Sequence, residues 1–316
     1  MRRFLLRCAF FIAPFVLGMG VLMWINRDFL PAPRLTPNLA MNEKVRFISR
    51  HAQRGCEVLA LGSSMALNNL ASDSVVAHLG TDRYLNAGAW GVGITESVRL
   101  GMVLTERLRP RTVLLVINLM DFRPGSPFTT EDSAAVADHL DDPDPLGAQL
   151  RHLDLTYLLR QTELNRLRFT DPANYEYLAY DAHGAAPLQV PRDRIVAGRY
   201  DQPPPRMKEL DGDRYAAFDQ FARWLHARGT RLVVLQSPYR PGLASADLDR
   251  TWTVHVNRLH RILDPLSFTL VDGRAMPRSD DDYCDASHFN RQGAERFTGW
   301  ALARSGLSVV GHSAAQ

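Results

Sequence analysis

The chain has 316 residues, of which 46% are hydrophobic and 22% charged, which is the composition of an ordinary globular protein with room for one large domain or two small ones. Its formal net charge is +3, and Lys44 and Lys208 are the only lysines, so almost all of the positive charge is arginine spread along the sequence. Because no basic cluster of the kind that binds nucleic acid is present, we expect no nucleic-acid partner.

Residues 1–30 predict an N-terminal transmembrane anchor. Arg2, Arg3 and Arg7 precede an uncharged run over residues 8–25, which is near the roughly 20 residues that a membrane-spanning helix needs. No small-x-small cleavage site follows this run, so an uncleaved anchor is favoured over a removed signal peptide. The position of the arginines predicts a single-pass protein of the cell membrane. Its N-terminus would be cytoplasmic and its main domain exported, either periplasmic or extracellular.

Residues 31–53 predict a linker and a short helix between the anchor and the main domain. The stretch "PAPRLTPNL", residues 31–39, is typical of an extended linker. The stretch "KVRFISRHAQRG", residues 44–55, indicates a short helix before the first strand.

The region 54–316 alternates predicted strands with predicted helices. The strands are continuous apolar runs, as expected for a parallel sheet covered on both faces; they are 57–61, 84–86, 112–118, 231–236 and 267–272. The helices are expected at 65–79, 94–108, 214–228, 246–263 and 291–304. This alternation predicts an α/β fold with a doubly wound, flavodoxin-like parallel sheet of about five strands in a three-layer α/β/α arrangement. Ligands of such sheets bind beyond the carboxyl ends of the strands.

Residues 122–212 interrupt the alternation and predict an insertion. They contain an acidic, proline-broken segment at 141–145, a predicted helix over 147–167 and a "QPPPR" hinge. Two interpretations stay open: a cap over the active end of the sheet that supplies substrate contacts, and a loosely packed spacer. Its tyrosines 175, 177 and 180 would either stack on sugar rings or pack structurally. Arg240, after the fourth strand, would bind an anionic group or be solvated.

Two short stretches carry the candidate chemistry. Ser64 follows the first predicted strand in "LGSS", where it is either a nucleophile at a strand end or part of an ordinary helix-capping turn. Asp285 and His288 lie three residues apart just before the last helix. They are candidates for an orienting carboxylate with its imidazole, for a metal pair, or for a helix cap beside a surface histidine. Since further ligands at metal-binding spacing are not evident, we expect no metal and no cofactor.

These stretches resemble the SGNH hydrolases, also called GDSL-type hydrolases. "LGSS" is similar to the family's Gly-Asp-Ser block at Gly62 and Ser64, with Ser63 in place of the acid. "NAGAWG" is similar to its second block at Asn86 and Gly91. The Asp-x-x-His block is followed, as in the family, by an asparagine at 290 and a glycine at 293.

The third block of the family departs from the expected pattern. Where relatives have Gly-x-Asn-Asp, this chain has Asn118 at the glycine position, Met120 at the asparagine and Asp121 last. Methionine cannot donate a hydrogen bond to an oxyanion, and the loss of one such donor can cost about 10²- to 10³-fold in rate. Either Asn118 substitutes, another group does, or activity is reduced. Envelope-anchored proteins similar to this chain also carry Gly-Ser-Ser in the first block.

The resemblance implies a catalytic triad of Ser64, His288 and Asp285, with Ser64, Gly91 and Asn118 as oxyanion donors. It predicts a membrane-anchored serine esterase or O-acyltransferase that acts on acyl groups, above all acetyl groups, of envelope or secreted polysaccharide. The expected partners are the lipid bilayer, an acylated carbohydrate or small ester, and a membrane protein that supplies the acyl group. Two alternatives stay open: a non-catalytic member of the fold that binds polysaccharide or serves as a scaffold of a membrane complex, and a thioesterase or lipase that acts on lipid.

Overall fold

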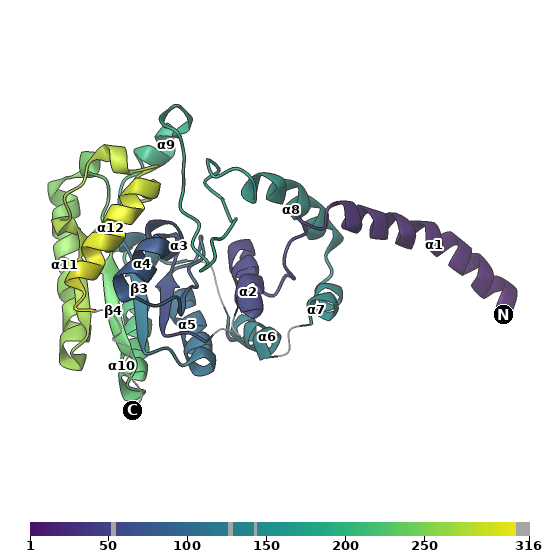
Figure 1. The fold of residues 1–316 in the computed structure, drawn as a ribbon, viewed down its shortest axis with the longest axis horizontal. Helices are drawn as coiled ribbons and strands as arrows, with labels where there is room; N and C mark the ends of the chain where they lie inside the picture. The colour runs from purple at the N-terminus through teal and green to yellow at the C-terminus, as the bar shows by residue number, and fades with distance from the viewer. Residues whose placement is uncertain (52–54, 126–128, 142–143, 308–316) are drawn as a thin grey trace.

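The computed structural model describes residues 1–51, 55–125, 129–141 and 144–307 (Figure 1). At its centre is a sheet of five parallel strands in the order β2-β1-β3-β4-β5. They are β1 (Val58–Gly62), β2 (Tyr84–Asn86), β3 (Thr112–Ile117), β4 (Arg231–Gln236) and β5 (Thr269–Asp272). The predicted α/β class and five-stranded parallel sheet are therefore confirmed. The order of the strands reverses between β1 and β3, which is where doubly wound sheets bind ligands.

Helices cover both faces of the sheet, which is consistent with three layers. Alternate residues of β3 point to opposite faces: Val113 and Leu115 join one apolar cluster, and Leu114 and Val116 join the other. The first cluster takes side chains from α2 (Leu39–His51), α5 (Ile94–Leu108), α10 (Gly212–Ala227) and α11 (Ala246–Leu263). The second takes them from α3 (Ser64–Asn69), α4 (Ser72–Leu79) and α12 (Arg291–Arg304).

The predicted bounds of α5, α11 and α12 are those observed, but the single helix expected over 65–79 is wrong. It divides into α3 and α4 because Leu70 has extended backbone angles and ends the first helix. The Ala71 N–H that follows donates to Thr298 Oγ1 on α12, at 2.9 Å. A tertiary hydrogen bond therefore replaces the helical one at this point.

The N-terminal residues form α1 (Arg2–Ile25), which projects from the body as a separate arm (Figure 1). Large apolar side chains along it are exposed, including Phe10, Phe11 and Trp24. Within the residues that the structure describes, no helix combines the length and hydropathy of a membrane span, so the predicted transmembrane helix is not confirmed.

The predicted extended linker over residues 31–39 has no regular secondary structure at 31–34, bends at 35–37 and enters α2 at Leu39, and it packs against the domain instead of forming a free linker. The Ala32 N–H donates to Glu43 Oε1 at 2.7 Å, and the Thr36 N–H donates to Asn42 Oδ1 at 2.8 Å. Both acceptors lie on α2, which begins at Leu39 and so five residues before the predicted helix. The predicted end of that helix includes residues 52–54, which lie outside the described part of the chain.

The insertion contains more helix than predicted. Its α-helices are α6 (Thr130–Asp141), α7 (Pro145–Arg151), α8 (Leu155–Arg168) and α9 (Ala197–Tyr200). The expected helix over 147–167 breaks between α7 and α8 because the Asp154 carboxylate accepts the Tyr157 N–H, at 2.9 Å, and so begins a new helix. Short 3₁₀ turns complete the chain: η2 (Leu119–Phe122), η3 (Arg192–Arg194), η4 (Met207–Glu209), η5 (Pro241–Leu243), η6 (Asp264–Leu266), η7 (Gly273–Ala275) and η8 (Asp280–Asp282).

Candidate active site

The turn that follows β1 places two serines differently. Gly62 has a φ of +142°, and a Cβ at this position would lie 2.2 Å from the Val116 carbonyl oxygen of β3, so only glycine fits. Ser63 is buried and caps α3, because its hydroxyl accepts the Met65 N–H at 3.2 Å. Ser64 is half-buried and is the first residue of α3. The first serine therefore holds the turn, and the second faces the space beyond the sheet.

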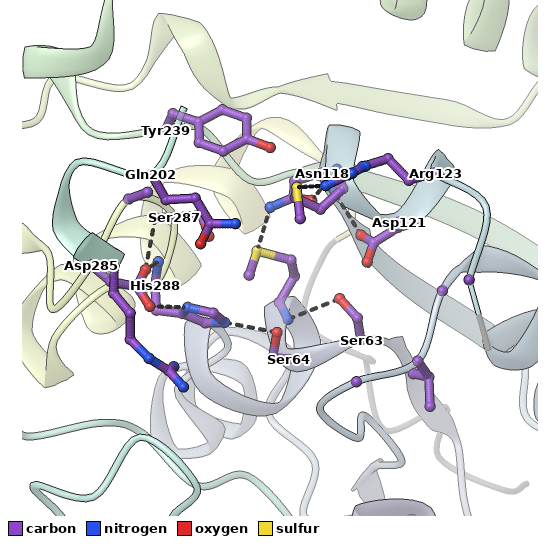
Figure 2. A pocket seen from close by; sticks show the side chains of 18 of the residues that line it. Ser63, Ser64, Asn118, Asp121, Arg123, Gln202, Tyr239, Asp285, Ser287 and His288 are labelled. Carbon is purple, nitrogen blue, oxygen red and sulfur yellow. Dashed lines mark hydrogen bonds and ion pairs between the residues drawn. The ribbon is translucent and has the colours of Figure 1, made fainter. Parts of the chain in front are cut away.

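Ser64, His288 and Asp285 form a continuous chain of hydrogen bonds (Figure 2). His288 Nε2 lies 2.7 Å from Ser64 Oγ, and His288 Nδ1 lies 2.7 Å from Asp285 Oδ2. The two partners of His288 come from segments more than 200 residues apart in the sequence, since Ser64 follows β1 and Asp285 precedes α12. The structure thus brings together the three residues predicted from the motifs, in the geometry of a nucleophile, a base and an orienting acid.

Asp285 is held as a carboxylate by its surroundings. Its Oδ1 accepts the N–H groups of Ser287 and His288, at 2.9 and 2.8 Å. Burial alone would raise the pKa of Asp285, but the charge of the His288 imidazolium and these hydrogen bonds outweigh burial and lower it. An ionised Asp285 fixes the tautomer in which Nδ1 of His288 carries a proton and Nε2 can accept one from Ser64.

Asn69 links the nucleophile helix to the histidine loop, and sequence reasoning missed it. Its Nδ2 donates to the Ser287 carbonyl at 2.9 Å and to Ser237 Oγ at 2.8 Å, and its Oδ1 accepts the Phe289 N–H at 2.9 Å. Two of these hydrogen bonds hold the backbone in place on either side of His288. The available sequence signal was the asparagine pair that follows the apolar residues 65–67; both asparagines are buried, and a buried amide needs polar partners.

A cleft of about 630 Å³ opens above the triad. Its lining joins the predicted triad and oxyanion residues with side chains of the insertion and of the loops after β3 and β4: Ser63, Ser64, Met65, Gly91, Val92, Gly93, Asn118, Met120, Asp121, Arg123, Pro124, Gly125, Arg199, Gln202, Pro203, Tyr239, Asp285, Ala286, Ser287 and His288. The backbone N–H groups of Ser64 and Gly91 make no hydrogen bond with the described residues. Both are therefore free to receive an oxyanion.

Asn118 lines the same cleft and caps η2. Its Oδ1 accepts the Met120 N–H at 2.8 Å, and its Nδ2 lies 3.0 Å from the sulfur of Met65. A thioether is a weak acceptor, so this amide group remains a candidate third donor. Met120 is half-buried in the lining and can offer no donor of its own through its side chain.

Asp121 is a buried carboxyl group in the lining that the motif comparison left without a role. Burial raises its pKa to about 7, although hydrogen bonds from the Ser63 side chain and the Asn118 backbone and the charge of His288 act against the shift. The Asn118 N–H donates to Asp121 Oδ2 at 2.7 Å. Asp121 therefore connects the turn after β1 with the turn after β3.

The remaining motif residues have structural roles. Asn86 is buried, donates to the Ala66 carbonyl at 2.7 Å and accepts the Gly88 N–H at 2.9 Å, which supports α3 from beneath. Asn290 caps α12. A Cβ at Gly293 would lie 2.3 Å from the carbonyl oxygen of Asp282, so this glycine allows α12 to approach the loop that carries His288.

Arg240 does not face the cleft as a free cation; it fixes the insertion beside it. Its guanidinium, 7% exposed, pairs with Asp201 at 2.6 Å and Asp280 at 3.0 Å, and its Nε donates to the Tyr200 carbonyl at 2.7 Å. The Ala286 N–H also donates to the Arg199 carbonyl at 3.1 Å. Residues 199–203 are thus docked on the histidine loop, which favours the cap over the loosely packed spacer.

The three tyrosines of the insertion that could have stacked on sugar rings have other partners. Tyr175 donates to the Cys284 carbonyl, Tyr177 packs on the core and Tyr180 lies over the Lys44 ammonium, so none of these tyrosines is in the cleft lining. Among the residues that the structure describes, no three or more histidine, cysteine or acidic side chains are grouped so that they could hold a metal ion.

Comparison with protein-family models gives no match for this chain, and comparison with curated proteins gives none either. The likeness to the SGNH hydrolases therefore depends on the short motifs and on the arrangement of their residues.

Proposed function

We propose that the protein is a serine esterase or O-acyltransferase of the SGNH type that acts on ester-linked acyl groups, above all acetyl groups, of envelope or secreted polysaccharide. One observation carries the proposal: Ser64, His288 and Asp285 are linked by two hydrogen bonds of 2.7 Å at the floor of an open cleft. A serine hydroxyl becomes a useful nucleophile when such a base can take its proton.

In the proposed reaction, Ser64 Oγ forms a bond to the ester carbonyl carbon while its proton moves to His288 Nε2. The negative charge that develops on the carbonyl oxygen is received by the N–H groups of Ser64 and Gly91 and by the Asn118 amide. The tetrahedral intermediate then breaks its bond to the alcohol, which takes the proton from His288. Water or an acceptor hydroxyl attacks the acyl-serine in the same way, and Ser64 recovers its proton.

We propose further that α1 attaches the protein to a membrane, with the main domain on the exported side. The support is chemical: its exposed side chains are mainly aromatic and aliphatic, and arginines precede the apolar run. Extraction of the full chain from membranes by detergent, but not by salt or alkaline buffer, is the expected result. Release by salt alone would contradict attachment through apolar contacts.

The enzymatic proposal is tested on the full-length protein with a small acetyl ester and a serine-reactive fluorophosphonate. Ser64→Ala should abolish both turnover and labelling, whereas Ser63→Ala should keep labelling because Ser63 contributes a cap and not the nucleophile. Labelling that persists in Ser64→Ala and disappears in Ser63→Ala would refute the assignment. The acyl-enzyme formed from the acetyl ester, and not the phosphonate adduct, is then supplied with water alone or with a glycan acceptor. Release of the acyl group by water indicates a hydrolase, and release only to the acceptor indicates a transferase.

A second candidate is a non-catalytic polysaccharide-binding or scaffold protein of a membrane complex. The observation in its favour is Met120, which lies in the cleft lining where the family carries an asparagine donor. This candidate predicts affinity for carbohydrate without acyl turnover and without any effect of His288→Ala.

A further inference from the structure

The cleft contains free hydrogen-bond donors beyond those that the proposed reaction uses. Arg123, Arg199, Gln202 and Tyr239 line it together with the triad. Tyr239 follows β4, whereas the other three residues belong to the insertion, with Arg123 at its start just after η2 and Arg199 and Gln202 near its end. Figure 2 draws the Gln202 amide directed toward the middle of the cleft and the Tyr239 ring at its border.

The two arginines of this set are weakly neutralised. Arg199 is exposed, has no ion pair with any described residue, and lies over the Tyr175 ring at 4.5 Å, which restricts its side chain. Arg123 has one carboxylate partner among the described residues, Glu209 at 3.6 Å, and both side chains of that pair are about 40% exposed. Pairs of this kind contribute little, so Arg123 can exchange its partner for a ligand.

Tyr239 offers a donor that the protein itself does not use. Its side chain is 3% exposed, and its hydroxyl makes no hydrogen bond of normal geometry with the described residues. Burial raises the pKa of Tyr239 well above its usual value, so the hydroxyl keeps its proton. A buried, unpaired hydroxyl in a cleft wall costs free energy unless a ligand satisfies it.

The carboxylates of the lining, by contrast, are occupied. Both oxygens of Asp285 accept hydrogen bonds within the histidine loop, and Asp121 Oδ2 accepts the Asn118 N–H. The lining of the cleft therefore includes two arginines, a tyrosine and a glutamine, and its acidic groups are engaged in the protein. Such a donor set fits a carboxylate or phosphate group of a ligand.

Building on the proposed function, we propose that the substrate is an anionic glycan whose charged group, a carboxylate or a phosphate, is bound by Arg123 and Arg199 with Gln202 and Tyr239. Arg199 is the main determinant, because the hydrogen bond between its carbonyl and the Ala286 N–H fixes its backbone beside the histidine loop. The insertion then determines specificity, because its residues favour substrates whose acyl ester lies next to a negative charge.

The test compares three acetylated sugars that differ at one carbon: galactose, galacturonate and galactose 6-phosphate. With the full-length protein, kcat/KM should be at least tenfold higher for an anionic sugar than for the neutral one, and the better of the two anions identifies the charged group. A charge-assisted hydrogen bond accounts for about ten- to a hundredfold in affinity. Arg199→Gln and Arg123→Gln should therefore each reduce this preference about tenfold. Arg199→Lys should retain part of it.

Arg194→Gln is the matched control, because Arg194 lies on the same insertion, is exposed, and is outside the cleft lining. It should leave the preference unchanged. Equal kcat/KM for the three sugars in the unmodified protein, or a preference that survives both arginine substitutions, would overturn the inference while Ser64-dependent turnover keeps the proposed function.

A binding measurement tests the anion site without any need for turnover. Calorimetry with Ser64→Ala and two probes without acetyl groups, a galacturonate oligomer and galactose 6-phosphate, should give binding of at least one probe that Arg199→Gln weakens about tenfold. If the unmodified protein turns over none of the esters and this binding is present, the proposed enzymatic function fails and the anion site stands. If binding is absent as well, the anion site fails.

Discussion

Replacing Asn69 with alanine tests whether the histidine loop is positioned from the nucleophile helix. The side chain is fully buried and makes three hydrogen bonds of 2.8–2.9 Å, two of them to the backbone on either side of His288. Alanine would leave the Ser287 carbonyl and the Phe289 N–H without partners in a space that water does not reach. We therefore expect His288 to lose its fixed distance from Ser64.

The magnitude follows from the groups left unpaired. Each buried polar group without a partner costs about 1–3 kcal/mol, so two cost about 2–6 kcal/mol, a large share of the 5–15 kcal/mol that typically holds a domain folded. For activity, a displacement of about 1 Å in a catalytic group costs on the order of 10²-fold. Asn69→Ala should therefore lower both the melting temperature and, at temperatures where the variant is folded, kcat by about 10²-fold with little change in KM.

Asn68→Ala is the matched control for this experiment. Asn68 is the neighbouring residue on α3 and is also buried, but its Nδ2 donates to the Ala186 carbonyl, at 2.6 Å, and not to the histidine loop. It should lower stability by about 1–3 kcal/mol and keep kcat. The assays are thermal denaturation, hydrolysis of an acetyl ester and the rate of fluorophosphonate labelling. Equal losses of kcat in the two variants, or full kcat in Asn69→Ala, would refute the positioning role.

Three further predictions concern other residues of the site. Because burial raises the pKa of Asp121 from 3.8 to about 7, the folded protein retains a proton that the unfolded chain releases, and stability is lost as pH rises from about 4 to 7. Asp121→Asn should remove this loss. The unfolding free energy of the variant should therefore exceed that of the unmodified protein by up to about 4 kcal/mol at pH 8 and by almost nothing at pH 4. Denaturant titrations at the two pH values measure this, and a difference that does not change with pH would contradict the prediction. Arg240→Gln should release the Asp201 segment, which limited proteolysis would detect as faster cleavage, with Ser64 labelling retained; unchanged cleavage would argue against the tether. Gly62→Ala places a Cβ 2.2 Å from the Val116 oxygen and should cost about 3 kcal/mol or more, measured by chemical denaturation, and a normal unfolding midpoint would show that the turn can relax.

The sheet could be predicted from the sequence because its strands are continuous apolar runs between helices of regular period. The bounds of α5, α11 and α12 follow from their local patterns alone. The break between α3 and α4 could not be predicted in this way, since a hydrogen bond from Ala71 to Thr298, 227 residues away, replaces the helical one. The buried course of residues 31–39 was likewise not visible, because prolines indicate an extended chain and do not reveal what it packs against.

The site could be predicted as far as its residues lie in short motifs at strand ends. Ser64, Asp285 and His288 belong to such motifs, and the structure adds the distances between them. Asn69 and Asp121 could not be assigned, because their roles depend on partners that only the fold brings near. Arg240 shows the same limit: the sequence placed it at the active end, but its two carboxylate partners come from different loops, and they make it a tether rather than a ligand-binding cation.

The chain departs from the SGNH motifs at Ser63 and at Met120, and the residues around these two positions are connected in the structure. Ser63 provides the helix cap at the position where SGNH hydrolases have an acid, and its side chain also acts against the burial that raises the pKa of Asp121. Asp121 in turn accepts the Asn118 N–H, and the Asn118 side chain lies against the Met65 sulfur, a weak acceptor that an oxyanion would readily replace. Met120 therefore need not supply a donor if Asn118 is held in place by the turn that Asp121 and Ser63 stabilise. A site with this arrangement would lose oxyanion stabilisation through Asn118 and Asp121 together, and the two substitutions combined should cost less than the sum of their separate effects.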